Sequence, residues 1–92
     1  GLEHPYTAFA LIRLSQISLH HEKYDEALTY QENALTVLES TVGDSHPYTA
    51  EACLYRGSLH QQQGEIDDAL RLYERAFRII ETVLGEAHPR TI

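Results

Sequence analysis

The chain has 92 residues, of which 42% are apolar and 23% are charged, a composition typical of one small globular domain rather than a disordered or fibrous protein. Its 14 acidic residues against 7 Lys and Arg give a formal charge of −7, which argues against nucleic acid as a partner, and no apolar run is long enough for membrane insertion. The single cysteine, Cys53, excludes a disulfide-bridged secreted scaffold and favours a reducing, cytoplasmic location.

The chain contains an internal repeat with a spacing of 42 residues. The letters HPYTA occupy residues 4–8 and return at 46–50, and HPRT follows in part at 88–91. Self-similarity at a fixed period is the signature of a repeat architecture. The sequence therefore predicts a single domain, 1–92, with these units: a first repeat at 4–45, a second at 46–87 and the start of a third at 88–92.

The first repeat is predicted to fold into two helices. Pro5 suits the first helical position, and the residue before a proline is held out of helical geometry, so the first helix begins there. The break is predicted at residues 22–23, although Glu22 is poorer than glycine at the positive φ that ends a helix. Acidic residues at 25–26 then open the second helix, where the helix dipole favours them, and Gly43 ends it.

The second repeat follows the same plan. Pro47 opens its first helix, a break containing Gly64 follows at residues 63–65, and acidic residues at 67–68 open a last helix that Gly85 is expected to stop. No segment alternates between apolar and polar residues over the length of a strand. The predicted fold class is therefore all-α.

The residues of these helices resemble the tetratricopeptide repeat, in the longer form found in kinesin light chains. The resemblance covers His4 to His88, and its signature segments are Tyr24-Asp25-Glu26-Ala27, Ile66-Asp67-Asp68-Ala69, Val42-Gly43 with His46-Pro47, and Leu84-Gly85 with His88-Pro89. It implies a short right-handed solenoid of two antiparallel helix-turn-helix units with a truncated third repeat. It also implies a module that binds a protein or peptide and needs no cofactor.

The resemblance places a concave groove on the first helices of the two repeats. The groove residues that it implies are Phe9, Ile12, Arg13, Gln16, Leu19 and His20 from the first repeat, and Glu51, Leu54, Tyr55, Ser58, Gln61 and Gln62 from the second. Leu54 and Tyr55 are read in two ways: they cover the neighbouring helix, or they form an apolar anchor pocket, since Tyr is enriched at binding hot spots.

Two features depart from the family pattern. Kinesin light chains commonly carry an Asn pair where this chain has Ile12-Arg13 and Leu54-Tyr55, and co-chaperone repeats use one of those Asn residues to clamp a C-terminal carboxylate. The missing Asn residues argue against such a clamp in the groove and against cargo recognition of the kinesin kind. Arg56 also stands where the first repeat has the apolar Leu14.

The histidines and Cys53 are read as structural residues. One histidine per repeat marks a boundary: His4, His46 and His88. His20 and His21 are adjacent, so their side chains point roughly 100° apart on a helix and chelate one ion poorly. Cys53 falls on an apolar core position. We therefore predict no metal site, no catalytic residue and no enzyme activity.

The last helix carries an apolar stripe that no capping helix covers. Because solenoid repeats bury their apolar faces against neighbours, we expect the chain to be a segment of a longer array and isolated copies to associate. The predicted self-association face comprises Phe77, Ile80, Val83 and Leu84.

Three functions remain open at this point. The first is an adaptor or scaffold module that binds a peptide or partner helix in the groove. The second is a structural spacer or self-assembly segment whose groove stays empty. The third is a regulatory array packed against an effector domain of the same polypeptide.

Overall fold

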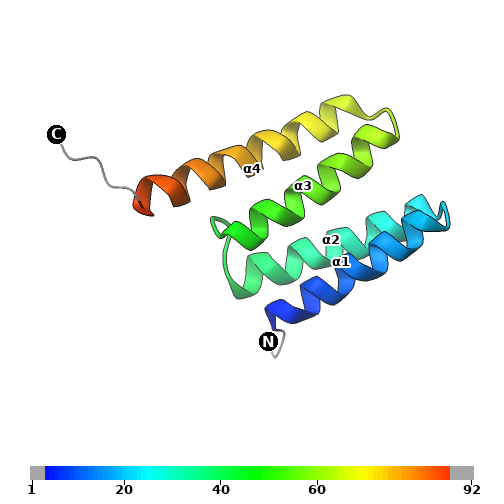
Figure 1. The fold of residues 1–92 in the computed structure, drawn as a ribbon, viewed down its shortest axis with the longest axis horizontal. Helices are drawn as coiled ribbons and strands as arrows, with labels where there is room; N and C mark the ends of the chain where they lie inside the picture. Colours follow the sequence, from blue (N-terminus) through cyan, green and yellow to red (C-terminus); the bar gives the residue numbers. More distant parts are fainter. Residues whose placement is uncertain (1–3, 88–92) are drawn as a thin grey trace.

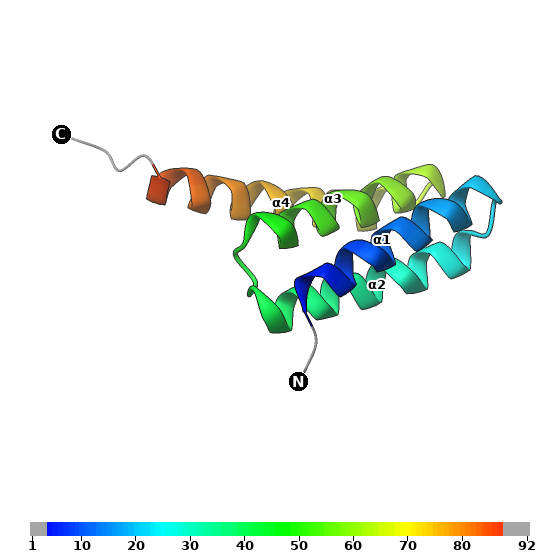
Figure 2. The ribbon, with the colours of Figure 1, turned by 60° about the horizontal axis from the view of Figure 1, so that its bottom comes forward.

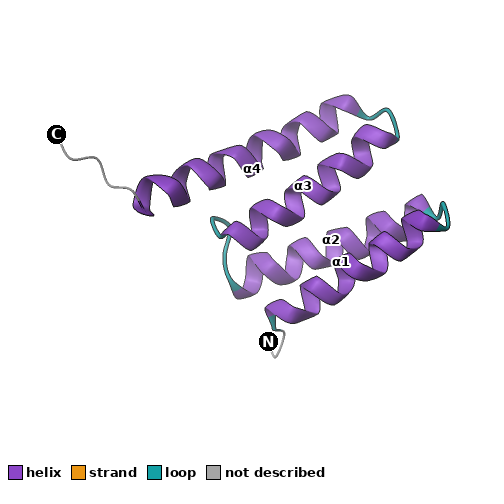
Figure 3. Ribbon diagram, viewed as in Figure 1, coloured by secondary structure: helices purple, strands orange, loops and turns teal. Residues whose placement is uncertain are grey.

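The computed structural model of the chain describes residues 4–87 and contains four helices in that range, with no strand among them. They are α1 (Pro5–His20), α2 (Tyr24–Thr41), α3 (Pro47–Gln62) and α4 (Ile66–Ala87), drawn in Figures 1 and 3. The predicted all-α fold class is confirmed. The predicted start of a third repeat at 88–92, and with it the boundary role of His88, lies outside the described residues.

The two His-Pro pairs form matching helix starts. In α1 the His4 Nδ1 atom accepts a hydrogen bond from the backbone N–H of Tyr6 at 3.2 Å, and in α3 the His46 Nδ1 atom accepts one from Tyr48 at 3.0 Å. The first N–H groups of a helix have no partner within the helix, so a side-chain acceptor at the cap stabilises it. These two histidines are thus N-caps, which gives a physical basis to the boundary role predicted for them.

The breaks inside both repeats lie where the sequence predicts them, and Glu22 ends the first helix although it is less suited to a positive φ than glycine. It adopts a positive φ of 61°, close to the 79° of Gly64 in the equivalent turn. In both turns a backbone N–H three residues after the last helical residue bonds back to the helix, from Lys23 to Ser18 O at 2.8 Å and from Glu65 to His60 O at 2.9 Å. The same helix-ending motif therefore forms at both breaks, and in the first repeat a non-glycine residue bears the strain of about 1–2 kcal/mol.

The predicted stop at Gly85 is wrong. Gly43 has a positive φ of 99° just beyond α2, as expected, whereas α4 runs through Gly85 to Ala87. The reason lies in the residues that follow each glycine. Asp44-Ser45 favours turns and caps, while Glu86-Ala87 favours helix strongly enough to carry the helix past one glycine.

The four helices form two antiparallel hairpins stacked on each other. Helix α1 packs on α2 and α3 packs on α4, while α2 and α3 join the hairpins (Figures 1 and 2). Small residues are frequent in the shared core, and they let the helices approach closely. The core cluster comprises Ala8, Ile12, Ala34, Leu35, Val37, Leu38, Ala50, Ala52, Cys53, Ala76 and Ile79.

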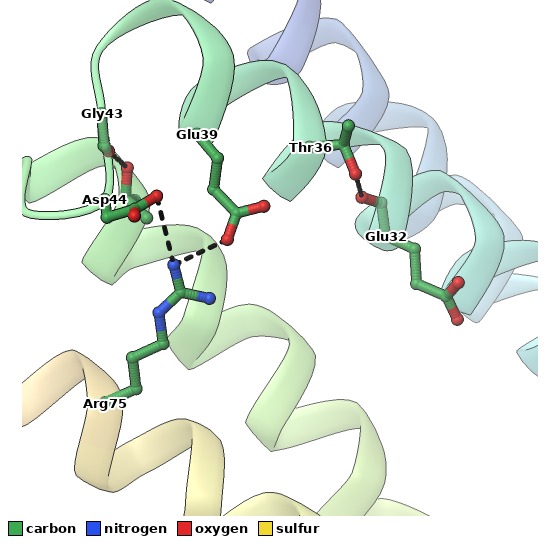
Figure 4. Close-up of polar contacts among 7 residues, drawn as sticks. Glu32, Thr36, Glu39, Gly43, Asp44 and Arg75 are labelled. Atoms are coloured by element: carbon green, nitrogen blue, oxygen red, sulfur yellow. Dashed lines mark hydrogen bonds and ion pairs between the residues drawn. The ribbon is translucent and has the colours of Figure 1, made fainter.

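A polar contact also links the two repeats. The Arg75 guanidinium on α4 donates to Glu39 Oε2 on α2 at 2.7 Å, and Asp44 Oδ1 lies 4.0 Å away (Figure 4). Partial burial lowers the pKa of Arg75, but the hydrogen bond to Glu39 and the charge interactions with Cys53, Glu39 and Asp44 together outweigh it and raise that pKa. Arg75 is therefore a fixed positive charge that ties α4 to the end of α2.

Candidate functional site

A hollow of about 230 Å³, here named the α1–α3 hollow, lies between the first helices of the two repeats. All its lining residues belong to the predicted groove. They are Phe9, Ile12, Arg13, Gln16, Glu51 and Tyr55.

Helical spacing explains how these side chains come together. Positions 9, 12, 13 and 16 are three or four residues apart and share one face of α1, and Glu51 and Tyr55 are one turn apart on α3. Ile12 is buried and forms the floor. The Phe9 and Tyr48 rings form a T-shaped contact at a centroid distance of 4.9 Å, which fixes one wall.

Opposite charges stand at the rim of this hollow. Arg13 and Glu51 are both exposed, and neither forms an ion pair within residues 4–87. An apolar floor with aromatic walls accepts an apolar side chain, and the two rim charges leave a donor and an acceptor free to orient the chain that carries it.

The remaining predicted groove residues lie outside the lining of the α1–α3 hollow. Gln61 faces α4, where its Oε1 accepts a hydrogen bond from Tyr73 Oη at 2.8 Å. It borders a smaller hollow together with Ile66 and Leu70. The others are the exposed His20, Leu54, Ser58 and Gln62 and the partly buried Leu19.

The predicted self-association face is an apolar strip on α4. Phe77 is 62% exposed, Ile80 40% and Leu84 53%, whereas Val83 is partly buried against the core. Ile66 and Leu70 extend the strip toward the start of the helix, because they precede Phe77 by eleven and seven residues and so share its face. The same helical spacing in the sequence identifies these two residues, which the prediction missed.

Comparison between the repeats explains this exposure. Leu35, the counterpart of Phe77 42 residues earlier, is only 5% exposed, because the second repeat covers it. At the other end of the stack Ile17 is 57% exposed, whereas its counterpart Leu59 is 2% exposed. Each end of the described stack thus exposes an apolar helix face, whereas the equivalent face of the other repeat is buried between the two hairpins.

A second hollow, of about 480 Å³, lies where α2, α3 and α4 meet, and we name it the α2–α4 hollow. Four of its lining residues are charged residues of α3 and α4 that the sequence analysis did not assign to a site. The lining comprises Leu28, Glu32, Arg56, His60, Asp68, Arg71, Leu72 and Arg75.

Side chains of metal-ligating type meet beside this hollow. His60 Nδ1 lies 3.0 Å from Glu65 Oε1, and with a carboxylate oxygen of Asp68 the three ligand-type atoms lie within 4.8 Å of one another. The sequence analysis missed this grouping, because His60 lies on α3, Glu65 in the turn that follows and Asp68 on α4. The surroundings oppose a cation: Arg71 pairs with Asp68, and Glu65 and Asp68 lie at the start of α4, where the helix dipole is positive.

Cys53 is fully buried in the shared core, as the sequence predicts. Burial raises the pKa of its thiol, while the nearby charges of Arg75 and Arg56 lower it and that of Glu39 raises it. A buried thiol with a raised pKa is a poor nucleophile, and Cys53 contributes packing.

Comparison with known proteins identifies one family. The family model described as tetratricopeptide repeat matches residues 6–82 of the chain. No curated protein matches it. Within the described residues, no helix combines the length and the apolar character needed to cross a bilayer.

Proposed function

The chain belongs to the tetratricopeptide repeat family, whose members generally mediate protein–protein interaction, and we propose that it binds an extended segment of a partner protein across α1 and α3. It then acts as an adaptor or scaffold module. The α1–α3 hollow is the observation that supports this function, since it joins apolar, aromatic and charged groups from both repeats.

The chemistry of the hollow indicates what the segment carries. An apolar side chain fits over Ile12 between Phe9 and Tyr55, and the rim favours an acidic residue near Arg13 and a basic residue near Glu51. The 42-residue period also leads us to propose the kinesin light chain-like form of the repeat. The unpaired, buried Cys53 supports a cytoplasmic location.

The groove proposal predicts that Tyr55→Ala combined with Arg13→Glu weakens binding at least thirtyfold, because an aromatic hot spot and an orienting charge are lost together. A peptide selected from a random displayed library against the chain serves as the probe. Its dissociation constant is measured by fluorescence anisotropy for both proteins.

The matched control is Lys23→Glu with Tyr24→Ala, which also reverses one positive charge and removes one tyrosine ring, at exposed positions outside the α1–α3 hollow. We expect this control to bind like the original chain. Equal affinity of the groove variant and the original chain would contradict the groove as the binding surface.

A second candidate function is self-assembly, and the exposed ends of the stack favour it. The α4 strip of Phe77, Ile80 and Leu84 is the counterpart of the α2 face that packs on α3, and α1 is the counterpart of α3. We propose that α4 of one copy packs on α1 of the next and repeats the internal contact between hairpins. Such a head-to-tail contact does not close on itself, so it produces open chains.

Self-assembly predicts that Phe77→Glu abolishes association, because it puts a charge at the centre of the apolar strip. Sedimentation velocity of the original chain is expected to show a mass that rises with concentration up to the high micromolar range. The variant Thr29→Glu adds the same charge at an exposed position of α2 and should associate as the original does. A strict monomer in all three proteins would reject self-assembly.

A further inference from the structure

Arg56 occupies an unusual position in the α2–α4 hollow. It aligns with Leu14 of the first repeat, so a guanidinium stands where the repeat pattern has an apolar side chain. Its Nε atom is buried and has no hydrogen-bond partner within residues 4–87, and no carboxylate in that range lies at ion-pair distance from it. A buried polar group without a partner is destabilising, so a turn of the Arg56 side chain toward the hollow that gives Nε an anionic partner is favourable.

The other basic residues around the hollow have acidic partners within the chain. Arg71 pairs with Asp68, and Arg75 donates to Glu39 at 2.7 Å. His60 contacts Glu65 at 3.0 Å. Glu32 is exposed on the α2 wall, and its carboxylate forms no ion pair with the arginines. Among the described residues of this hollow, Arg56 is therefore the cation left without an anionic partner.

We propose that the α2–α4 hollow binds the carboxylate of an acidic side chain from a partner protein, with Arg56 as the principal donor. A guanidinium presents parallel N–H groups that match a carboxylate. Leu28 and Leu72 in the same lining contact the aliphatic part of that side chain. This site is separate from the α1–α3 hollow and does not depend on the groove function.

The charges of the hollow favour a carboxylate over a phosphate or a metal ion. Glu32 and Asp68 lie in the lining, and their negative charges repel a dianion more strongly than a monoanion. Three arginines in the same lining oppose a divalent cation. A singly charged carboxylate is the ligand that both sets of charges tolerate.

The test uses the ¹⁵N-labelled chain and two probes at constant ionic strength. N-acetylglutamic acid α-amide carries one carboxylate, and N-acetylglutamine amide is its neutral isostere. We expect the acidic probe alone to shift the Arg56 Nε–H signal and the backbone signals of His60 and Leu72, with saturation in the millimolar range. Arg56→Leu is expected to weaken this binding about ten- to a hundredfold.

The controls separate the proposed site from other effects. Arg56→Leu installs the residue of the first repeat, and if that chain fails to fold, Arg56→Gln replaces it. Arg78→Leu removes an exposed arginine that does not line the hollow and should leave probe binding unchanged.

Three results would overturn the proposal. The first is equal binding of the neutral probe. The second is binding of inorganic phosphate as tight as that of the acidic probe, which would reject the carboxylate. The third combines two observations: the original chain does not bind the acidic probe, and Glu32→Gln strongly shifts the Arg56 Nε–H signal of the probe-free chain. Together they would make Glu32 the internal partner of Arg56.

Discussion

Leu38→Ala is expected to lower the free energy of unfolding by about 2–5 kcal/mol, the range for deleting a large aliphatic side chain in a packed core. Leu38 has 0% exposure and is the largest fully buried side chain among the described residues. It belongs to the cluster shared by both hairpins, so its loss leaves a cavity where the repeats meet. Urea unfolding followed by circular dichroism at 222 nm measures the change.

The internal repeat supplies a matched control for this prediction. Ile80 is the counterpart of Leu38 in the second repeat, but it is 40% exposed, because no described helix covers it. Ile80→Ala is expected to cost about 1 kcal/mol or less, since water already reaches the site. Equal losses in the two variants, measured at low micromolar concentration to limit association, would contradict the role of hairpin stacking in burying Leu38.

The 42-residue register made most of the fold predictable. Local chemistry sets the helix boundaries: proline opens α1 and α3, and acidic residues open α2 and α4. Apolar residues at helical spacing then identify the faces that pack. Because both repeats carry the same signals, a helix boundary predicted wrongly in one repeat can be recognised by comparison with the other.

The helix ends at Glu22 and Gly85 show that residue type alone does not decide where a helix stops. The break at Glu22 lies where the sequence predicts it although the residue is not glycine, whereas the stop predicted at Gly85 is wrong. The bond from Lys23 N–H to Ser18 O imposes the turn on Glu22, and the helix-favouring residues after Gly85 remove the turn there. Residue preference is a weak term that the surrounding backbone bonds override.

The two hollows differ in how far local sequence information predicts them. The α1–α3 hollow lies on two equivalent helices, and all its lining residues are among the groove positions that the family resemblance implies. The α2–α4 hollow depends on how far α4 lies from α2, which the sequence does not encode locally. The replacement of Leu14 by Arg56 was visible in the register, but its unpartnered Nε atom was not.

Gly57→Ala is expected to destabilise the chain by about 1–2 kcal/mol, even though alanine favours helix more than glycine does. A Cβ atom on Gly57 would lie 2.8 Å from Tyr73 Cε1 and 3.0 Å from Tyr73 Cδ1. The bond from Tyr73 Oη to Gln61 holds the ring in place, so relieving the clash means losing that bond or separating α3 from α4. Thermal unfolding and urea unfolding both measure the loss.

Gly85→Ala is the matched control, because a Cβ atom there meets nothing within 4 Å and Gly85 lies inside α4. This variant should gain up to about 1 kcal/mol from helix propensity. The two identical substitutions are thus expected to have opposite signs. A gain in both would show that the Tyr73 ring moves aside without cost.

In the first repeat, a different pair of residues makes the contact that Gly57 and Tyr73 make in the second, and this pair allows a further test. Ser15 and Gln31 are the counterparts of Gly57 and Tyr73, and Gln31 Nε2 donates to Ser15 Oγ at 3.3 Å. Gly57→Ser alone should clash with the Tyr73 ring as alanine does, whereas Gly57→Ser with Tyr73→Gln recreates the smaller pair of the first repeat. We expect the double variant to be more stable than the sum of the single losses predicts, by about 0.5–3 kcal/mol of coupling. Strictly additive losses in a double-mutant cycle would show that the contact between positions 57 and 73 does not set the spacing of α3 and α4.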